Sequence, residues 1–101
     1  MTDFATSIDR LHNQIRHWEQ ARWSPRGAAT SPADVVFALV QHLADLAADA
    51  EHRDRRPVPR EVGLVLPDQL LVMSEDLLAA APAEPVLAEA TAAVTRTRQA
   101  L

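Results

Sequence analysis

The first segment of the chain carries an apolar residue at every third or fourth position up to residue 18. These residues follow the spacing 4, 3, 4, 3: Phe4, Ile8, Leu11, Ile15 and Trp18. Such spacing is the heptad form of a single helical stripe. Asp3 or Thr2 can cap the start of this helix, and Pro25 with Gly27 stops it. The pattern therefore predicts a helix from about residue 3 to about residue 22.

A second helix begins in the sequence SPAD. Ser31 is the expected N-cap, Pro32 takes the first helical position, and Asp34 suits the positive end of the helix dipole. Its inward face runs to about residue 53 through Val36, Leu39, Val40, Leu43, Leu46, Ala47 and Ala50. The next stretch, RRPVPREVGLVLP, holds three prolines and one glycine, and its apolar residues are evenly spaced: Val58, Val62, Leu64 and Leu66. We therefore expect part of this link to run extended over the bundle.

Two further helices follow the link. Pro67 begins the third, whose apolar face comprises Leu70, Leu71, Met73, Leu77, Leu78 and Ala81. The fourth runs from about Pro85 to residue 101, and its alanine-rich inward face lets a neighbouring helix approach closely. The sum is one all-α domain over residues 1–101, a small four-helix bundle-like fold with an extended Pro/Arg-rich link between the second and third helices.

Composition narrows the class of protein. The 101 residues are 48% hydrophobic and 24% charged, as in an ordinary globular chain, and the absence of cysteine excludes disulfides and thiolate metal sites. The sequence MTDFATSIDR has no signal-peptide pattern, and no apolar run is long enough to span a bilayer, so we expect a cytoplasmic protein without a membrane role. All ten basic residues are arginine, which we attribute to a GC-rich genome.

The two tryptophans have different positions relative to the first helical stripe. Trp18 lies on the stripe and is expected in the core. Trp23 lies off the stripe, and two roles stay open for it: it can plug the end of the bundle, or it can anchor a partner protein, because Trp is enriched among interface hot spots. Arg22 beside it and the spare apolar residue Val72 would belong to the same partner-binding surface.

A cluster of arginines lies in the Pro-rich link. Its members are Arg53, Arg55, Arg56 and Arg60. They can contact an anion or a nucleic-acid backbone. Alternatively, they cap the C-terminal carbonyls of the second helix and pair with the acidic half of the chain, since residues 61–95 hold six acids and no base.

Candidates for metal and catalytic chemistry are few. Asp9 with His12 and Asp49 with His52 repeat a carboxylate-x-x-His spacing, but each Asp is expected opposite the apolar stripe, so these groups should face water and no metal is expected. Gly27 and Gly63 are the only glycines, which leaves no phosphate-binding loop. No catalytic residue and no cofactor is assigned. An apolar ligand lined by Met73 and Leu77 is a third, weaker option.

One resemblance to a known group of proteins suggests the kind of organism but no activity. The run LADLAADAEHRDRRPVPREVGLVLPDQLLVMSEDLLAA, residues 43–80, resembles a segment of small uncharacterised helical proteins of high-GC Gram-positive bacteria and covers about a third of the chain. That group has no established activity, so the resemblance implies a bacterial protein and no functional residues.

The sequence leads to two hypotheses of function. The first is a non-enzymatic helical module for protein–protein interaction, with a protein partner or a second copy as in a homodimer. Its basis is the heptad stripe, the wide apolar face of the third helix and the spare residues Val72 and Trp23. The alternative is a regulatory module that binds nucleic acid or another polyanion through Arg53, Arg55, Arg56 and Arg60, with a strong dependence on salt.

Overall fold

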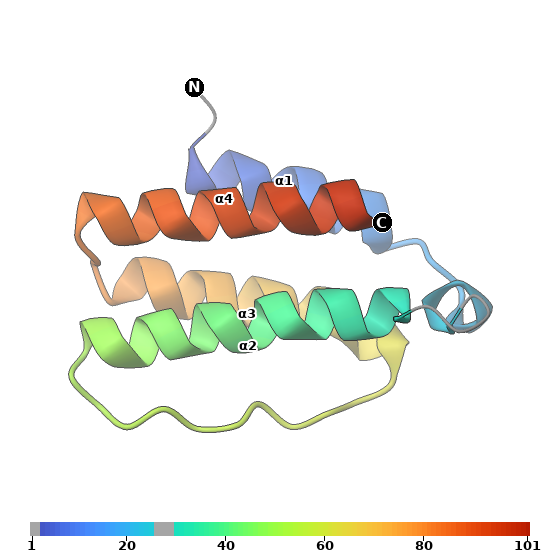
Figure 1. Cartoon of the computed structure of the whole chain (residues 1–101), viewed down its shortest axis with the longest axis horizontal. Coiled ribbons are helices and arrows are strands. Elements are labelled where there is room, and N and C mark those ends of the chain that lie inside the picture. The colour runs from blue at the N-terminus through green and yellow to red at the C-terminus, as the bar shows by residue number, and fades with distance from the viewer. Residues whose placement is uncertain (1–2, 26–29) are drawn as a thin grey trace.

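The computed structural model describes residues 3–25 and 30–101 (Figure 1). Within these ranges there are four α-helices and two short 3₁₀ helices, and no strand. The α-helices are α1 (Phe4–Ile15), α2 (Pro32–Ala50), α3 (Leu66–Ala79) and α4 (Glu84–Ala100), and the 3₁₀ helices are η1 (Gln20–Trp23) and η2 (Gly63–Val65). The expected all-α, bundle-like fold is confirmed. No helix in the described ranges has the length and apolarity that crossing a membrane would require.

Two of the four helices run in one direction along the bundle and two run in the other (Figure 1). Each of α1 and α2 lies against both α3 and α4. Figure 1 shows that α1 and α4 run one way along the bundle, whereas α2 and α3 run the other way. Because α2 and α3 are parallel neighbours, the segment between them has to return along the whole length of α2. A single long crossover of this kind is a known variant of helical bundles.

The N-terminal caps of α1 and α2 follow the sequence signals. The Asp3 side chain accepts a hydrogen bond from the Thr6 N–H at 2.8 Å, and the Ser31 hydroxyl accepts one from the Asp34 N–H at 3.0 Å. α2 ends at Ala50, a few residues before the expected position. There His52 takes a positive φ of 56°, and the Arg53 N–H donates to the Ala48 carbonyl at 3.0 Å. This Schellman-type end turns the chain back toward the start of α2.

The first helix is shorter than predicted. α1 ends at Ile15 instead of about residue 22; a turn follows, in which the Trp18 N–H donates to the Ile15 carbonyl at 3.1 Å, and η1 begins at Gln20. The turn keeps Trp18 buried and brings its ring to 4.8 Å from the ring of Trp23, at an angle of 57°. Tertiary packing of two large aromatic rings therefore overrides the helical pattern of the sequence here.

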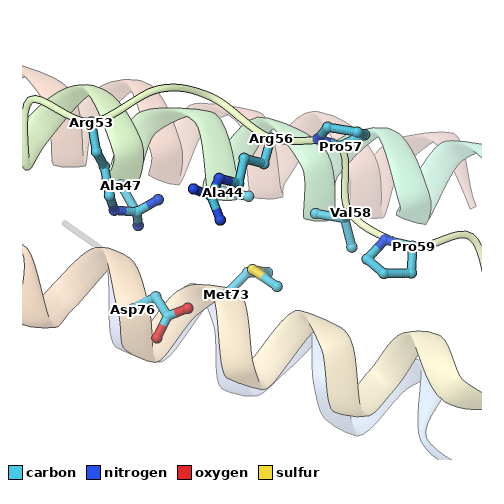
Figure 2. Close-up of a pocket in the computed structure, with 9 residues that line it drawn as sticks. All are labelled: Ala44, Ala47, Arg53, Arg56, Pro57, Val58, Pro59, Met73 and Asp76. Atoms are coloured by element: carbon cyan, nitrogen blue, oxygen red, sulfur yellow. The ribbon is translucent and has the colours of Figure 1, made fainter.

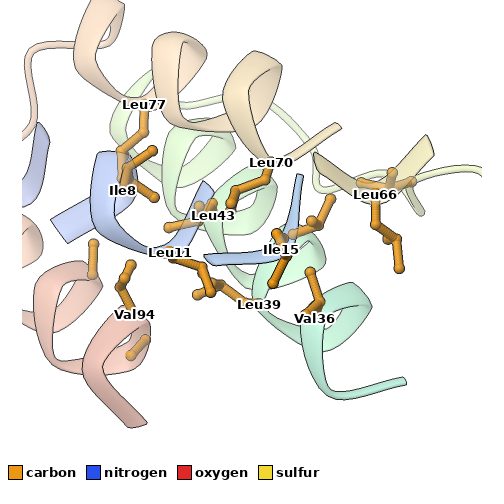
Figure 3. Close-up of a cluster of buried hydrophobic side chains, with 14 of the residues drawn as sticks. Ile8, Leu11, Ile15, Val36, Leu39, Leu43, Leu66, Leu70, Leu77 and Val94 are labelled. Atoms are coloured by element: carbon orange, nitrogen blue, oxygen red, sulfur yellow. The ribbon is translucent and has the colours of Figure 1, made fainter. Parts of the chain in front are cut away.

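The core is filled mainly by aliphatic side chains from all four helices (Figure 3). Its fully buried members include Leu11 and Ile15 from α1, Val36 and Leu43 from α2, Leu66, Leu70 and Leu77 from α3, and Val94 from α4. Besides Val94, α4 buries the small residues Ala90 and Ala93, in line with its predicted alanine-rich inner face. On α3, Leu78 was expected inside but is 45% exposed. Ser74 takes the buried position instead, and its hydroxyl donates to the Leu71 carbonyl at 2.8 Å.

Candidate functional site

Residues 51–62, here called the strap, form the crossover from α2 to α3 and run extended along the bundle (Figure 1). One side chain of α2 holds the middle of the strap. The Gln41 Nε2 donates to the Arg56 carbonyl at 3.1 Å, and the Val58 N–H donates to the Gln41 Oε1 at 2.8 Å. From α3, the Gln69 Nε2 donates to the Pro59 carbonyl at 3.0 Å. The strap is thus fixed to both parallel helices.

Apolar contact adds to these hydrogen bonds. Val58 is buried and belongs to the core cluster, whereas Pro57 and Pro59 on either side of it are exposed. Of the four evenly spaced apolar residues of the link, Val58 and Leu66 are buried, whereas Val62 and Leu64 face solvent.

Three of the four clustered arginines pair with carboxylates. Arg55 binds Asp49 with two hydrogen bonds of 2.6 and 3.0 Å. Arg60 donates to Asp34 at 2.6 Å, and its guanidinium lies 4.7 Å from the ring centre of Phe37. Arg53 lies 3.1 Å from Glu51.

The sequence suggested that these arginines cap the C-terminal carbonyls of the second helix and pair with the acids of residues 61–95, and their observed partners differ from both. In the described parts of the chain, the acids belong to α2 and to its C-terminal end, not to residues 61–95, and the side chains of these three arginines bind carboxylates instead of the carbonyls of α2. The capping group is the backbone N–H of Arg53. The physical reason is the direction of the strap, which runs back beside α2 and brings the acids of that helix within reach.

Two of these pairings lower the pKa of a carboxyl group. The hydrogen bonds from Arg55 hold the pKa of Asp49 below its ordinary value. The pKa of Asp34 is also lowered, first by the hydrogen bond from Arg60 and then by its interactions with Ser31. Both pairs are on the surface, where solvent screens them.

A cavity of about 190 Å³ lies between the strap, α2 and α3 (Figure 2). Its walls are apolar and charged residues from all three elements: Ala44, Ala47, Arg53, Arg56, Pro57, Val58, Pro59, Met73 and Asp76. In Figure 2 the side chains of Arg53 and Arg56 reach from the strap into the space above α3, and Asp76 lies on the opposite wall. Of the two residues named in the sequence for an apolar ligand, Met73 lines this cavity and Leu77 is fully buried elsewhere in the core.

Trp23 occupies the interior, which is the first of the two roles left open by the sequence. Its side chain is 2% exposed and packs against Trp18 and Gly63. Among the described residues, 3–25 and 30–101, its indole Nε1 has no hydrogen-bond partner. A side chain buried to this extent presents no surface to a partner, so the assignment of Trp23 to a partner-binding surface does not fit this structure. Arg22 is exposed, and its guanidinium lies 4.6 Å from the ring centre of Trp18.

Large apolar side chains are exposed next to Gly63, the residue that packs against Trp23. Val62 and Leu64, on either side of the buried Gly63, are 58% and 54% exposed. Val72, the remaining partner-binding residue suggested by the sequence, is 51% exposed on α3. The exposed acids Asp68, Glu75 and Asp76 are its near neighbours on the helix at spacings of three and four residues.

The two Asp-x-x-His pairs do not come together with further ligands. Asp9 is exposed on α1, and Asp49 is bound to Arg55. In the parts of the chain that the structure describes, no three His, Cys, Asp or Glu residues are grouped as a metal site would need.

Sequence patterns did not mark several residues that build the site. Gln41 and Gln69 carry no periodic signal, and the strap groups that they bind lie 10 to 17 positions away in the sequence. In the sequence, Asp76 is only one of the six acids of residues 61–95. A comparison of the chain with protein-family models, curated proteins and solved structures gives no match.

Proposed function

We propose that the protein is a cytoplasmic, non-enzymatic helical interaction module, and that its docking face consists of Val62, Leu64 and Val72. The exposure of Val62 and Leu64, each more than half open to solvent on one short turn, carries this proposal. Single exposed apolar residues are ordinary on a protein surface, but neighbouring ones more often mark an interaction site.

The turn that presents Val62 and Leu64 is held from below. Gly63 is buried against the ring of Trp23, and the Val65 N–H donates to the Val62 carbonyl at 3.0 Å. A surface that is already ordered loses little conformational entropy on binding. Trp23 therefore supports the docking face without being part of it.

Val72 extends the docking face along α3. It lies seven residues after Val65, the N-cap of α3, which corresponds to about 10 Å along the axis of an α-helix. The residues around this line are acidic: Glu61, Asp68, Glu75 and Asp76. The matching partner has an apolar centre and a basic rim.

The same charges decide between a protein partner and a second copy of the chain. A symmetric dimer through this face would place it against itself. The acids would then face acids, and like charges across an interface oppose association. The charge pattern therefore favours a different protein over a homodimer on this face.

The test is affinity capture with a double variant and a matched control. Leu64→Ser with Val72→Ser removes the apolar centre, and Leu78→Ser changes an equally apolar exposed residue on another side of α3. The wild type and Leu78→Ser should capture partners whose binding surface has a basic rim. The double variant should recover at least about tenfold less of these partners, because each buried aliphatic side chain contributes over 1 kcal/mol to binding. Equal recovery with the double variant would reject the face. Sedimentation of the purified chain should give the mass of a monomer. If the chain is instead a dimer that Leu64→Ser dissociates, the occupant of the docking face is a second copy of the chain and not a basic partner.

The polyanion-binding alternative has less support. Arg53, Arg55 and Arg60 each lie against a carboxylate, so their charges are largely balanced locally. Heparin retention that falls when Arg55 and Arg60 are changed to Gln would restore this alternative.

A further inference from the structure

We propose that the cavity between the strap, α2 and α3 binds a small zwitterion, such as a free amino acid with a short apolar side chain. The inference does not depend on a protein partner at the docking face, although Asp76 borders both surfaces. It follows from the size of the cavity, its apolar floor and the opposite charges on its two walls.

The strap supplies the positive wall. Arg53 and Arg56 both line the cavity, and their guanidinium groups extend into it (Figure 2). Arg53 shares its charge with Glu51, but Arg56 forms no ion pair within the described residues 3–25 and 30–101. A guanidinium group matches a carboxylate with two parallel hydrogen bonds. Arg56 is therefore the residue that would bind the carboxylate of the ligand.

α3 supplies the negative wall. The carboxylate of Asp76 lies across the cavity from the two arginines (Figure 2). In the same described ranges it forms no ion pair, with these arginines or with any other cation. A carboxylate accepts hydrogen bonds from an ammonium group. A ligand with only one charge would satisfy one wall and meet a like charge on the other, whereas a zwitterion satisfies both.

The floor of the cavity accepts an apolar side chain. Ala44, Ala47, Val58 and Met73 contribute methyl, isopropyl and thioether groups, and the flexible Met side chain adapts to different shapes. At about 190 Å³, the cavity is smaller than the roughly 300–1,000 Å³ of pockets for drug-sized ligands. The occupant is therefore a molecule of a few heavy atoms.

The backbone around Arg56 is already in place for this role. Gln41 holds the Arg56 carbonyl and the Val58 N–H, so the strap wall is fixed while the Arg56 side chain keeps its hydrogen-bonding capacity for a ligand. Arg56 is exposed, and only its backbone is held, so its guanidinium group is free to turn toward a ligand in the cavity.

Methionine NMR tests the proposal directly, since Met73 and Met1 are the only methionines. With ¹³C-methyl methionine, titration of the full chain with L-valine should shift the Met73 resonance saturably and leave Met1 unchanged. N-acetyl-L-valine lacks the ammonium group and L-valinamide lacks the carboxylate, so each should bind at least about tenfold more weakly. No saturable shift of Met73, or equal binding of all three compounds, would overturn the proposal.

Variants separate the two walls. Arg56→Gln should abolish the valine-induced shift of Met73, and Asp76→Asn should make N-acetyl-L-valine bind as well as valine. Arg55→Gln is the matched control, because Arg55 is bound to Asp49 and does not line the cavity. Valine binding that survives Arg56→Gln, or that falls as much in Arg55→Gln, would also overturn it. The proposal would also be overturned if Asp76→Asn alone shifted the Met73 resonance while valine caused no shift. Asp76 would then only pair with the arginines of the strap.

Discussion

The two long connections of the bundle are stabilised in different ways. The connection from α1 to α2 places Trp18 and Trp23 inside the molecule and meets Gly63 there. The strap from α2 to α3 leaves most of its side chains exposed and buries only Val58. Its backbone groups are instead bound by the side-chain amides of Gln41 and Gln69.

This difference shows which physical term each connection depends on. Within the part of the chain that the structure describes, the indole N–H of Trp23 has no partner, so the contribution of Trp23 to the stability of the fold comes from apolar burial, against the cost of an unpaired polar group. The strap buries little, but an extended segment beside helices has backbone groups that need partners. Changes in the first connection should therefore have large effects on packing, and changes in the strap smaller effects on hydrogen bonding.

The largest effect is expected at Trp23. Trp23→Ala should reduce the free energy of unfolding by about 3–5 kcal/mol, because it leaves a cavity beside Trp18 and Gly63. Trp23→Phe should cost much less, since the lost indole N–H makes no hydrogen bond to any described residue. Urea unfolding followed by circular dichroism measures both. A Phe variant as unstable as the Ala variant would show that the unpaired N–H has a partner in solution.

A slightly smaller effect is expected at Gly63. A Cβ atom added there would lie 2.5 Å from the Trp23 Cβ, so Gly63→Ala forces the two connections apart and should cost about 1–3 kcal/mol. Leu64→Ala, at the exposed neighbouring position, should change stability by less than about 0.5 kcal/mol. If thermal melts place both variants at the same midpoint, the close approach of Gly63 to Trp23 does not limit the fold.

In the strap the largest effect is expected at Gln41. Gln41→Leu keeps a similar volume but leaves the N–H of the buried Val58 without a partner, which should cost about 1–3 kcal/mol. Gln69→Leu removes one exposed hydrogen bond and should cost about 0.5–1.5 kcal/mol. Hydrogen exchange of the Val58 amide should quicken in Gln41→Leu, and unchanged exchange would argue against this anchor.

The smallest effect concerns pH. Arg55 lowers the pKa of Asp49 in the folded state, so the stabilisation is present above the carboxyl pKa of the unfolded chain, about 4, and is lost as the pH falls through the folded value. Stability measured from neutral to acidic pH should therefore fall less steeply in Arg55→Gln than in the wild type. Arg96→Gln serves as the control at an arginine outside the strap. Added salt should shrink the difference, and a difference independent of salt would contradict an ionic cause.

The same contrast explains what could be predicted from sequence. Local signals gave the starts of the helices, as the Ser31 cap shows, and they gave an extended link between the second and third helices. The end of α1 was missed because no Gly or Pro marks residues 16–19 and the pairing of Trp18 with Trp23 decides it. The strap partners were missed because the parallel course of α2 and α3, which brings Arg60 to Asp34 across 26 positions, has no local signature.

The cavity could not be found from the sequence for a related reason. Arg56 and Asp76 belong to different elements, and each is one of many similar charges along the chain. Only the return of the strap beside α3 brings them to opposite walls. Conversely, the burial of Trp23 was one of two open alternatives, because the helical pattern fails just before it.

The parallel course of α2 and α3 also sets how short the chain between them can become. α2 advances about 27 Å over its 19 residues, and residues 51–62 can reach about 40 Å when fully stretched. Roughly four residues could be deleted before the reach runs out, whereas insertions cost little free energy. The length of the proline-rich strap therefore determines whether α2 and α3 can be parallel. A deletion of more than about four residues would force α3 to reverse its direction, and the helices would have to pair differently.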